Sequence, residues 1–235
     1  MDTKKKDLYD ENMFLLRIRE EFDKENNHVN GYDITFKNRH PDRLLAVSYD
    51  VSNPSVNSNP DFKKKEKFEE DIITPFISKF SNSVKLDCKK LPPLDKYQDL
   101  ELLFPNLKLD IPLEKKLFIV NGFVADEFSY TLGNLKFSDE IEVRLQYSLW
   151  YESKKRKSPV IAEFDIDINA DESGKSNKTV LEGFSISLLN QVYEFYHALQ
   201  KEDIAQSKEK EKGKRKKTQS NSTKTKTQYA YDYKK

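Results

Sequence analysis

Three short segments of the chain alternate charged and apolar residues, and their charged groups are of the types that bind phosphate and metal. They read LRIR at 16–19, TFK at 35–37 and EFDID at 163–167. In an extended strand residues i, i+2 and i+4 share one face, so each segment predicts a strand with one charged face. Guanidinium and ammonium groups suit phosphate oxygens, whereas carboxylates suit Mg²⁺ or Mn²⁺. Together the three segments could hold a polyphosphate and its metal.

The same alternation has a simpler interpretation. Half-buried strands of antiparallel sheets commonly place their charges in water and their apolar side chains in the core. Taken on spacing alone, the three segments favour this second interpretation, in which the charges are solvated and carry no chemistry.

Composition predicts a folded body with an unfolded extension. The 235 residues are 34% charged and 36% hydrophobic, yet they include 15 Phe and 12 Tyr, enough aromatic side chains to build a core. We expect one domain over residues 1–205. No apolar run approaches the roughly 20 residues of a membrane helix. The single cysteine, Cys88, excludes an internal disulfide and is typical of a reducing compartment, so we expect a cytoplasmic protein without membrane contact.

The last part of the chain is strongly basic. Residues Lys208–Lys235 contain eleven Lys or Arg and three Asp or Glu, with almost no aliphatic side chains. Such a composition predicts a disordered basic tail, which we place at 206–235. The tail could make weak contact with nucleic acid, although a purely solubilising role is the more common one for such a segment.

Hydrophobic periodicity predicts mainly strands with a few helices. We expect strands at 12–22, 31–50 (with a bend at 39–43), 116–129, 140–151 and 159–168. Helical spacing predicts an amphipathic helix over 62–80 that is interrupted near Pro75, a short helix at 99–104, and a longer amphipathic helix over 186–199.

Several common catalytic motifs are missing from the sequence. It contains no Gly-rich phosphate loop, no G-x-S-x-G, no paired cysteines and no H-E-x-x-H. His28, His40 and His197 are far apart and have no ligand spacing. Nucleophilic catalysis by serine or cysteine therefore has no support.

The order of the charged segments resembles the CYTH superfamily of triphosphate tunnel enzymes, in particular a subgroup of uncharacterised bacterial CYTH-domain proteins. The resemblance covers roughly residues 1–203. The stretches that carry it are LLRIR at 15–19, DITFKNRHPDR at 33–43, FEEDI at 68–72 and AEF at 162–164.

This resemblance implies an α+β fold built on a closed antiparallel β-barrel with flanking helices. It implies that Mg²⁺ or Mn²⁺ assists hydrolysis of a triphosphate or polyphosphate inside the barrel. By motif position, the implied phosphate ligands are Arg17, Arg19, Lys37, Arg39 and Arg43, and the implied metal ligands are Glu163, Asp165 and Glu69.

One departure from the family bears on activity. The family's E-x-E-x-K strand does not precede Arg17, so we expect that the chain begins inside the domain and lacks the first barrel strand. Without those acidic residues, we expect little or no triphosphate hydrolysis. The alternative is a non-catalytic protein that binds phosphorylated ligands or nucleic acid.

Overall fold

The computed structural model describes most of the chain, and the chain divides into two compact units. The described residues are 1–23, 28–51, 61–73, 77–136, 142–153, 158–167 and 226–233, with Gln191 and Glu194. The first unit comprises 1–123 together with 223–235, and the second comprises 124–222. Each unit is described below by itself.

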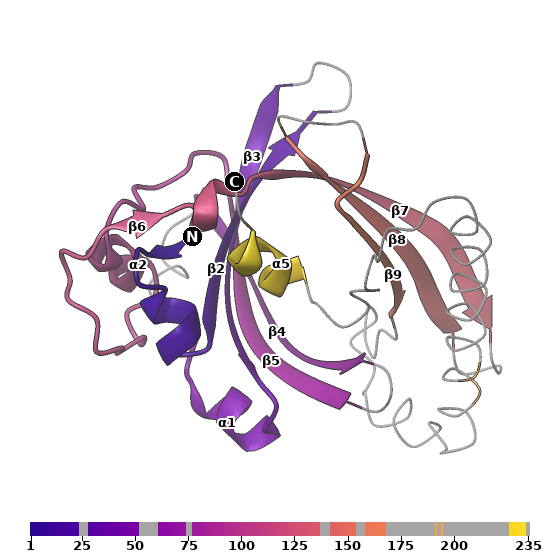
Figure 1. The fold of residues 1–235 in the computed structure, drawn as a ribbon, viewed down its shortest axis with the longest axis horizontal. Coiled ribbons are helices and arrows are strands. Elements are labelled where there is room, and N and C mark those ends of the chain that lie inside the picture. The colour runs from indigo at the N-terminus through magenta and orange to yellow at the C-terminus, as the bar shows by residue number, and fades with distance from the viewer. Residues whose placement is uncertain are drawn as a thin grey trace, which may run out of the picture. The chain divides into compact units, whose positions relative to one another are not determined.

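A four-stranded antiparallel sheet forms the centre of the first unit (Figure 1). Its strand order is β2-β3-β5-β4, and all three neighbouring pairs are antiparallel. The strands are β2 (Phe14–Phe22), β3 (Val29–His40), β4 (Phe62–Ile73) and β5 (Ile77–Cys88).

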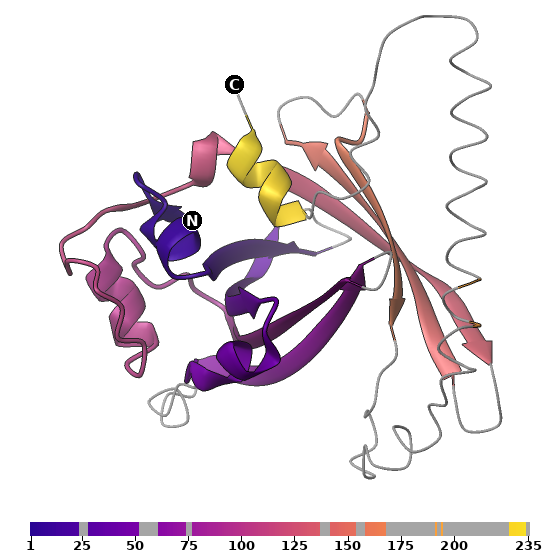
Figure 2. The ribbon, with the colours of Figure 1, turned by 60° about the horizontal axis from the view of Figure 1, so that its bottom comes forward.

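One face of this sheet carries the hydrophobic core. Phe14 and Phe36 stack with ring centroids 4.8 Å apart, and Phe36 also stacks on Phe104 at 5.0 Å. The core is covered by the helix α2 (Tyr97–Leu103) and by a two-stranded pair of β1 (Asp2–Thr3) with β6 (Leu117–Phe118). Figures 1 and 2 show α2 and this pair on the same side of the sheet. Burial of whole aromatic rings on one face leaves the other face free to be polar.

The helix predicted over 62–80 is wrong, because this segment forms the hairpin strands β4 and β5. Apolar residues occur at every second position from Val84 through Leu86 to Cys88 in β5, and that face joins the core. Period-two burial against β3 therefore outweighs the weak helical spacing of the charged segment before it. Pro75 falls between the two strands in the sequence.

The strand predicted over 31–50 ends early. β3 stops at His40, and Arg43–Ser48 form the helix α1. The side chain of Asp42 accepts hydrogen bonds from the backbone N–H groups of Leu44 at 2.7 Å and Leu45 at 3.1 Å, so it caps the helix. The short helix expected at 99–104 is confirmed by α2, where Asp99 accepts from the backbone N–H of Lys96 at 2.8 Å.

The second unit contains a three-stranded antiparallel sheet in the order β7-β8-β9. The strands are β7 (Ala125–Lys136), β8 (Glu142–Glu152) and β9 (Ile161–Asp167), which confirms the later predicted strands apart from their bounds. In the first unit, the start of the strand expected at 116–129 is instead β6 followed by the short turn η3 (Val120–Gly122). The register of β7 shifts between Thr131 and Gly133, a bulge at which Gly133 has a positive φ of 138°.

Within the predicted tail, Lys226–Asp232 form the helix α5, which packs within the first unit. The predicted disorder of 206–235 is therefore wrong for residues 226–232, whose two tyrosines, Tyr229 and Tyr231, pack against the rings of Phe123 and Tyr9. The predicted helix at 186–199 lies outside the described residues apart from Gln191 and Glu194, which are both helical.

The fold class is α+β, with mostly antiparallel strands and few helices among the described residues. None of the helices in the described part of the chain is long and apolar enough to span a bilayer.

Candidate functional site

The face of the four-stranded sheet opposite the core carries charged and hydroxyl side chains from all four strands. We call this surface the polar face. In each pair of neighbouring strands, odd-numbered residues lie opposite odd-numbered residues. Because alternate residues of a strand share a face, the odd-numbered residues of all four strands lie on the polar face. Among the described residues its charged and hydroxyl side chains are Arg17, Arg19, Glu21, Asp33, Thr35, Lys37, Arg39, Lys63, Lys65, Lys67, Glu69, Asp71, Lys79, Ser81, Ser83, Lys85 and Asp87. Nine of these side chains are cationic and five are acidic, so the surface has a positive surplus.

At one end of the polar face, cations of β3 reach over β5 to acids of β4. The Nζ of Lys37 lies 2.9 Å from Oε2 of Glu69, and Arg39 pairs with Asp71. The intervening β5 residues are Ser81 and Ser83, whose short side chains leave room for this reach. Both serines are buried beneath the ion pairs. Small residues in the middle strand thus allow non-adjacent strands to pair their charges.

Glu69 is ionised in this arrangement. Burial by itself raises the pKa of Glu69, but the charge and hydrogen bond of Lys37, followed by those of Lys67, outweigh burial and hold the pKa below its ordinary value. The Nζ of Lys67 lies 3.5 Å from Oε1 of Glu69. Both carboxylate oxygens of Glu69 therefore face lysines.

Toward the other end of the polar face, Asp33 is buried beside Lys85. The Lys85 Nζ lies 3.0 Å from Oδ2 of Asp33, 2.9 Å from Oδ1 of Asp87 and 4.0 Å from Oε1 of Glu21. The hydroxyl of Thr35 donates to Oδ1 of Asp33 at 2.9 Å. Burial lowers the pKa of Lys85, but its hydrogen bonds and the charges of Asp87 and Asp33 produce a net rise. Lys85 thus neutralises a buried carboxylate and stays cationic.

One cross-strand row of the polar face is rich in cations. Arg17 pairs in register with Thr35, Thr35 with Lys85, and Lys85 with Lys65. The guanidinium of Arg17 donates to the Thr35 hydroxyl at 3.3 Å. Lys65 is exposed and makes no ion pair with any described residue. Like charges directly opposite each other destabilise a sheet, but Lys85 is already paired with Asp33 and Asp87, so the exposed Lys65 is the lysine of this row that an anion could reach.

Four of the five predicted phosphate ligands lie together on the polar face, namely Arg17, Arg19, Lys37 and Arg39. Arg19 is 4.0 Å from Asp33. The fifth, Arg43, lies in α1 with its guanidinium 5.9 Å from the ring centre of Phe68, an even-numbered residue of β4. The structure does not bring Arg43 to the polar face. The helix that begins at Asp42 turns the chain away from β3.

The predicted metal ligands are divided between the two units. Glu69 belongs to the polar face, whereas Glu163 and Asp165 lie on β9 of the second unit. In that unit Glu163 faces Ser148 in register and Asp165 faces Gln146. The third acid of β9, Asp167, accepts a hydrogen bond from Arg144 at 2.6 Å. These side chains share one face of the β7-β8-β9 sheet, as the alternation predicts.

The described carboxylates of the polar face do not fit a preformed metal site. Glu21, Asp33 and Asp87 have oxygens within 4.8 Å of one another, as a divalent ion would require. The ammonium of Lys85 stands among them at the distances given above, where a metal ion would have to lie. Glu69 is likewise engaged by two lysines. Binding of a metal would have to displace these lysines.

Sequence reasoning missed Asp33, Lys65 and Lys85 as members of the site. The alternation of Lys85-Leu86-Asp87 is as clear as that of Thr35-Phe36-Lys37, whereas the KKKEK run at 63–67 has no apolar residue to show a period. Lys65 was missed because the segment 62–80 was interpreted as a helix, in which alternate residues do not share a face. Asp33 and Lys85 lie outside that segment, and their place in the site depends on the pairing of β3 with β5.

Comparisons with protein families, with curated proteins and with solved structures yield no match to this chain.

Proposed function

We propose that the polar face binds a triphosphate or polyphosphate ligand. The observation that carries this proposal is the cross-strand row of Arg17, Thr35, Lys85 and Lys65, in which two lysines face each other directly. Arginine can donate two parallel hydrogen bonds to a phosphate group, and lysines add point charges along a row of phosphates. Because Lys85 is already paired with Asp33 and Asp87, bound phosphate oxygens would be stabilised chiefly by Lys65 and Arg17.

The function we infer is binding with little hydrolysis. A phosphohydrolase needs carboxylates that are free to hold a divalent ion, and the described acids of the polar face are engaged by lysines and arginines. Mg²⁺ or Mn²⁺, if it takes part, would supply neutralisation of the phosphate charge. Closure of the sheets into a CYTH-type barrel stays a prediction, and the four-stranded sheet alone supports the proposed function.

Calorimetric titration of the full chain with inorganic tripolyphosphate, with and without Mg²⁺, tests this proposal. We expect saturable binding that weakens with added salt, because the contacts are between charges. Lys65→Ala should lower the affinity by roughly tenfold, the effect of losing about 1.4 kcal/mol of charged contact. Lys64→Ala is the matched control, because Lys64 lies on the opposite face of the same strand and pairs with Glu66. Equal losses in both variants would contradict binding at the polar face.

A phosphate-release measurement in the same samples tests the second part. We expect release no faster than in the buffer that contains metal and tripolyphosphate alone. Robust turnover with Mg²⁺ or Mn²⁺ would instead support an active phosphohydrolase.

Weak nucleic-acid contact through Lys208–Lys235 is a separate prediction. Deletion of this segment would also remove α5 from the first unit, so a charge change is the cleaner test. Replacement of residues 214–217 by glutamine removes four cations and leaves α5 intact. A lower salt dependence of nucleic-acid retention would support the contact, and unchanged retention would dismiss it.

A further inference from the structure

The helix α5 is held by a set of groups that the polar face does not use. The Tyr231 hydroxyl donates to Oδ2 of Asp2 at 2.6 Å, and both side chains are buried. The ring of Tyr231 lies against that of Tyr9, with centroids 4.3 Å apart. The rings of Tyr229 and Tyr233 lie 5.5 and 5.0 Å from that of Phe123. The three alternate tyrosines of this short segment therefore contact two aromatic residues, Tyr9 and Phe123.

The last backbone carbonyls of α5 are also satisfied by side chains. Asn121 donates from Nδ2 to the carbonyl oxygens of Ala230 at 3.2 Å and of Tyr231 at 2.7 Å. The Nζ of Lys6 donates to the same Tyr231 oxygen at 3.1 Å. Helix ends leave carbonyls without partners inside the helix, so these two donors recognise a helix end.

The groups that receive α5 are positioned without it. Asp2 also accepts hydrogen bonds from the backbone N–H groups of Thr3 at 2.6 Å, Leu8 at 3.0 Å and Tyr9 at 3.1 Å. Three of its four donors thus come from its own segment. An isolated seven-residue helix is unstable in water, whereas the carboxylate it meets is preorganised. A preorganised site loses little conformational entropy when its partner binds. This arrangement is typical of a binding site and the peptide that it recognises.

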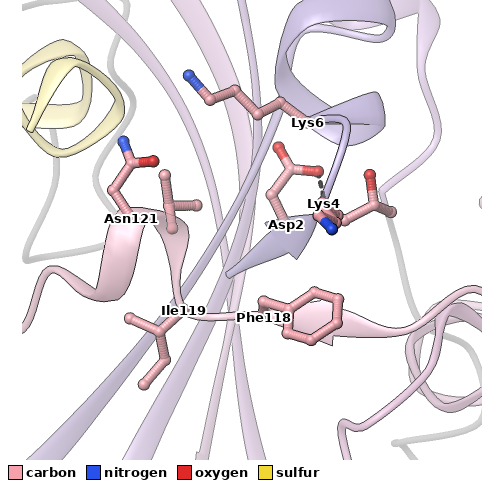
Figure 3. Close-up of a pocket in the computed structure, with 8 residues that line it drawn as sticks. Asp2, Lys4, Lys6, Phe118, Ile119 and Asn121 are labelled. Carbon is pink, nitrogen blue, oxygen red and sulfur yellow. Dashed lines mark hydrogen bonds between the residues drawn. The ribbon is translucent and has the colours of Figure 1, made fainter. Parts of the chain in front are cut away.

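A pocket adjoins this contact. It has a volume of about 340 Å³ and is lined by Asp2, Thr3, Lys4, Lys6, Phe118, Ile119, Val120 and Asn121. Figure 3 shows Lys6 and Asn121 at the side of the pocket that faces α5, with Phe118 and Ile119 beyond them. Three of the groups that bind α5, namely Asp2, Lys6 and Asn121, therefore also line open space beside it.

We propose that this surface, which we call the tyrosine-helix site, is a peptide-binding site that accepts the α5 segment of a second copy of this chain as well as its own. Residues 168–225 separate β9 from α5. Even at the rise of about 1.5 Å per residue of a helix, a chain of this length would span roughly 85 Å. A helix on so long a connection can reach a neighbouring molecule, and identical contacts would hold it there. The chain's own helix would dominate when the protein is dilute.

Binding of a synthetic, fluorescently labelled peptide of residues 223–235 to the full chain tests the site. The Tyr231→Ala chain, whose own helix has lost its central contact, should bind the peptide at least tenfold more tightly than the unmodified chain. A peptide that carries Tyr231→Phe should bind several-fold more weakly than the native peptide. Tyr130→Ala, a change at an exposed tyrosine of β7, is the control and should behave like the unmodified chain.

The exchange between copies is tested by mixing two full chains. Tyr231→Ala keeps the site and weakens the helix, whereas Asp2→Asn keeps the helix and weakens the site. We expect the mixture to form a heterodimer in sedimentation experiments, at concentrations at which neither variant dimerises alone.

Circular dichroism decides how a negative result is interpreted. If Tyr231→Ala retains its fold and binds no peptide, the proposal is overturned. If that variant unfolds, the unmodified chain with a large excess of peptide replaces it, and the absence of saturable binding there overturns the proposal equally.

Discussion

Lys37 and Glu69 form an ion pair across an intervening strand, with 2.9 Å between Nζ and Oε2. The first is a predicted phosphate ligand and the second a predicted metal ligand. In the folded chain each is the partner of the other, because Ser83 and Ser81 of β5 leave space above the middle strand. The polar face is therefore largely neutralised from within, and its positive surplus lies nearer the row that contains Lys65.

The Lys37–Glu69 pair should make stability depend on pH. The pKa of Glu69 is lowered in the fold, so the pair's contribution is present above the ordinary glutamate value of 4.5 and is lost as the pH falls through the lower folded value. Lys37→Met should therefore lower the free energy of unfolding by about 0.3–1 kcal/mol at pH 7 and by much less at pH 3. Urea unfolding across this range measures the difference. Lys108→Met, at an exposed lysine, should show no such pH dependence.

Reversing the charge of Lys65, which faces Lys85, should raise stability and weaken ligand binding. Lys65→Glu replaces a cross-strand repulsion by an attraction, so we expect it to raise the free energy of unfolding by about 0.2–1 kcal/mol and to weaken tripolyphosphate binding. Lys63→Glu is the matched control, because Lys63 faces Asp87 in register and its reversal should destabilise the sheet. Urea midpoints of the two variants should therefore move in opposite directions. A shift in the same direction would argue against register as the cause.

Lys85 should stabilise the buried Asp33 in the way a bound cation would. Lys85→Gln leaves that carboxylate without its closest charge, so we expect a loss of about 1–3 kcal/mol. The vacated space among Glu21, Asp33 and Asp87 would then suit a divalent ion. Mn²⁺ should raise the melting temperature of Lys85→Gln and leave that of the unmodified chain unchanged. Equal stabilisation of both would show that the lysine does not block the triad.

The hydrogen bond from Tyr231 to Asp2 should be lost when tyrosine ionises. Burial raises the pKa of Tyr231 well above its ordinary value of 10, and the bond to Asp2 raises it further. Its contribution to stability is thus complete below about pH 10 and declines as the pH rises above that value. Tyr231→Phe should cost about 1.5–3 kcal/mol at pH 7, and this difference should shrink toward pH 11 in urea unfolding. Tyr130→Phe, at an exposed tyrosine, should leave stability unchanged at pH 7.

The alternation of charged and apolar residues correctly predicted which side chains share a face wherever one face of a strand is buried. It correctly placed Arg17 with Arg19 and Thr35 with Lys37, because Leu16, Ile34 and Phe36 point into the core on the other side. It failed for 62–80, where the charged first half of the hairpin has few apolar residues to show a period. The capped helix α1 was also missed, although Pro41-Asp42 before a run of helix-forming residues is a recognisable start signal.

The sequence by itself determined which side chains share a face, because the period of a strand is set by its backbone geometry. It also determined that one face of each of these strands is charged, since arginines, lysines and carboxylates occur at alternate positions. The tertiary structure decided which of these charges are already paired, because that depends on strand order. The order β2-β3-β5-β4 brings Lys37 to Glu69 and Lys85 to Asp33. It likewise decided that a basic tail ends in a helix docked on Asp2, a contact between residues too distant in the sequence for any local pattern to reveal.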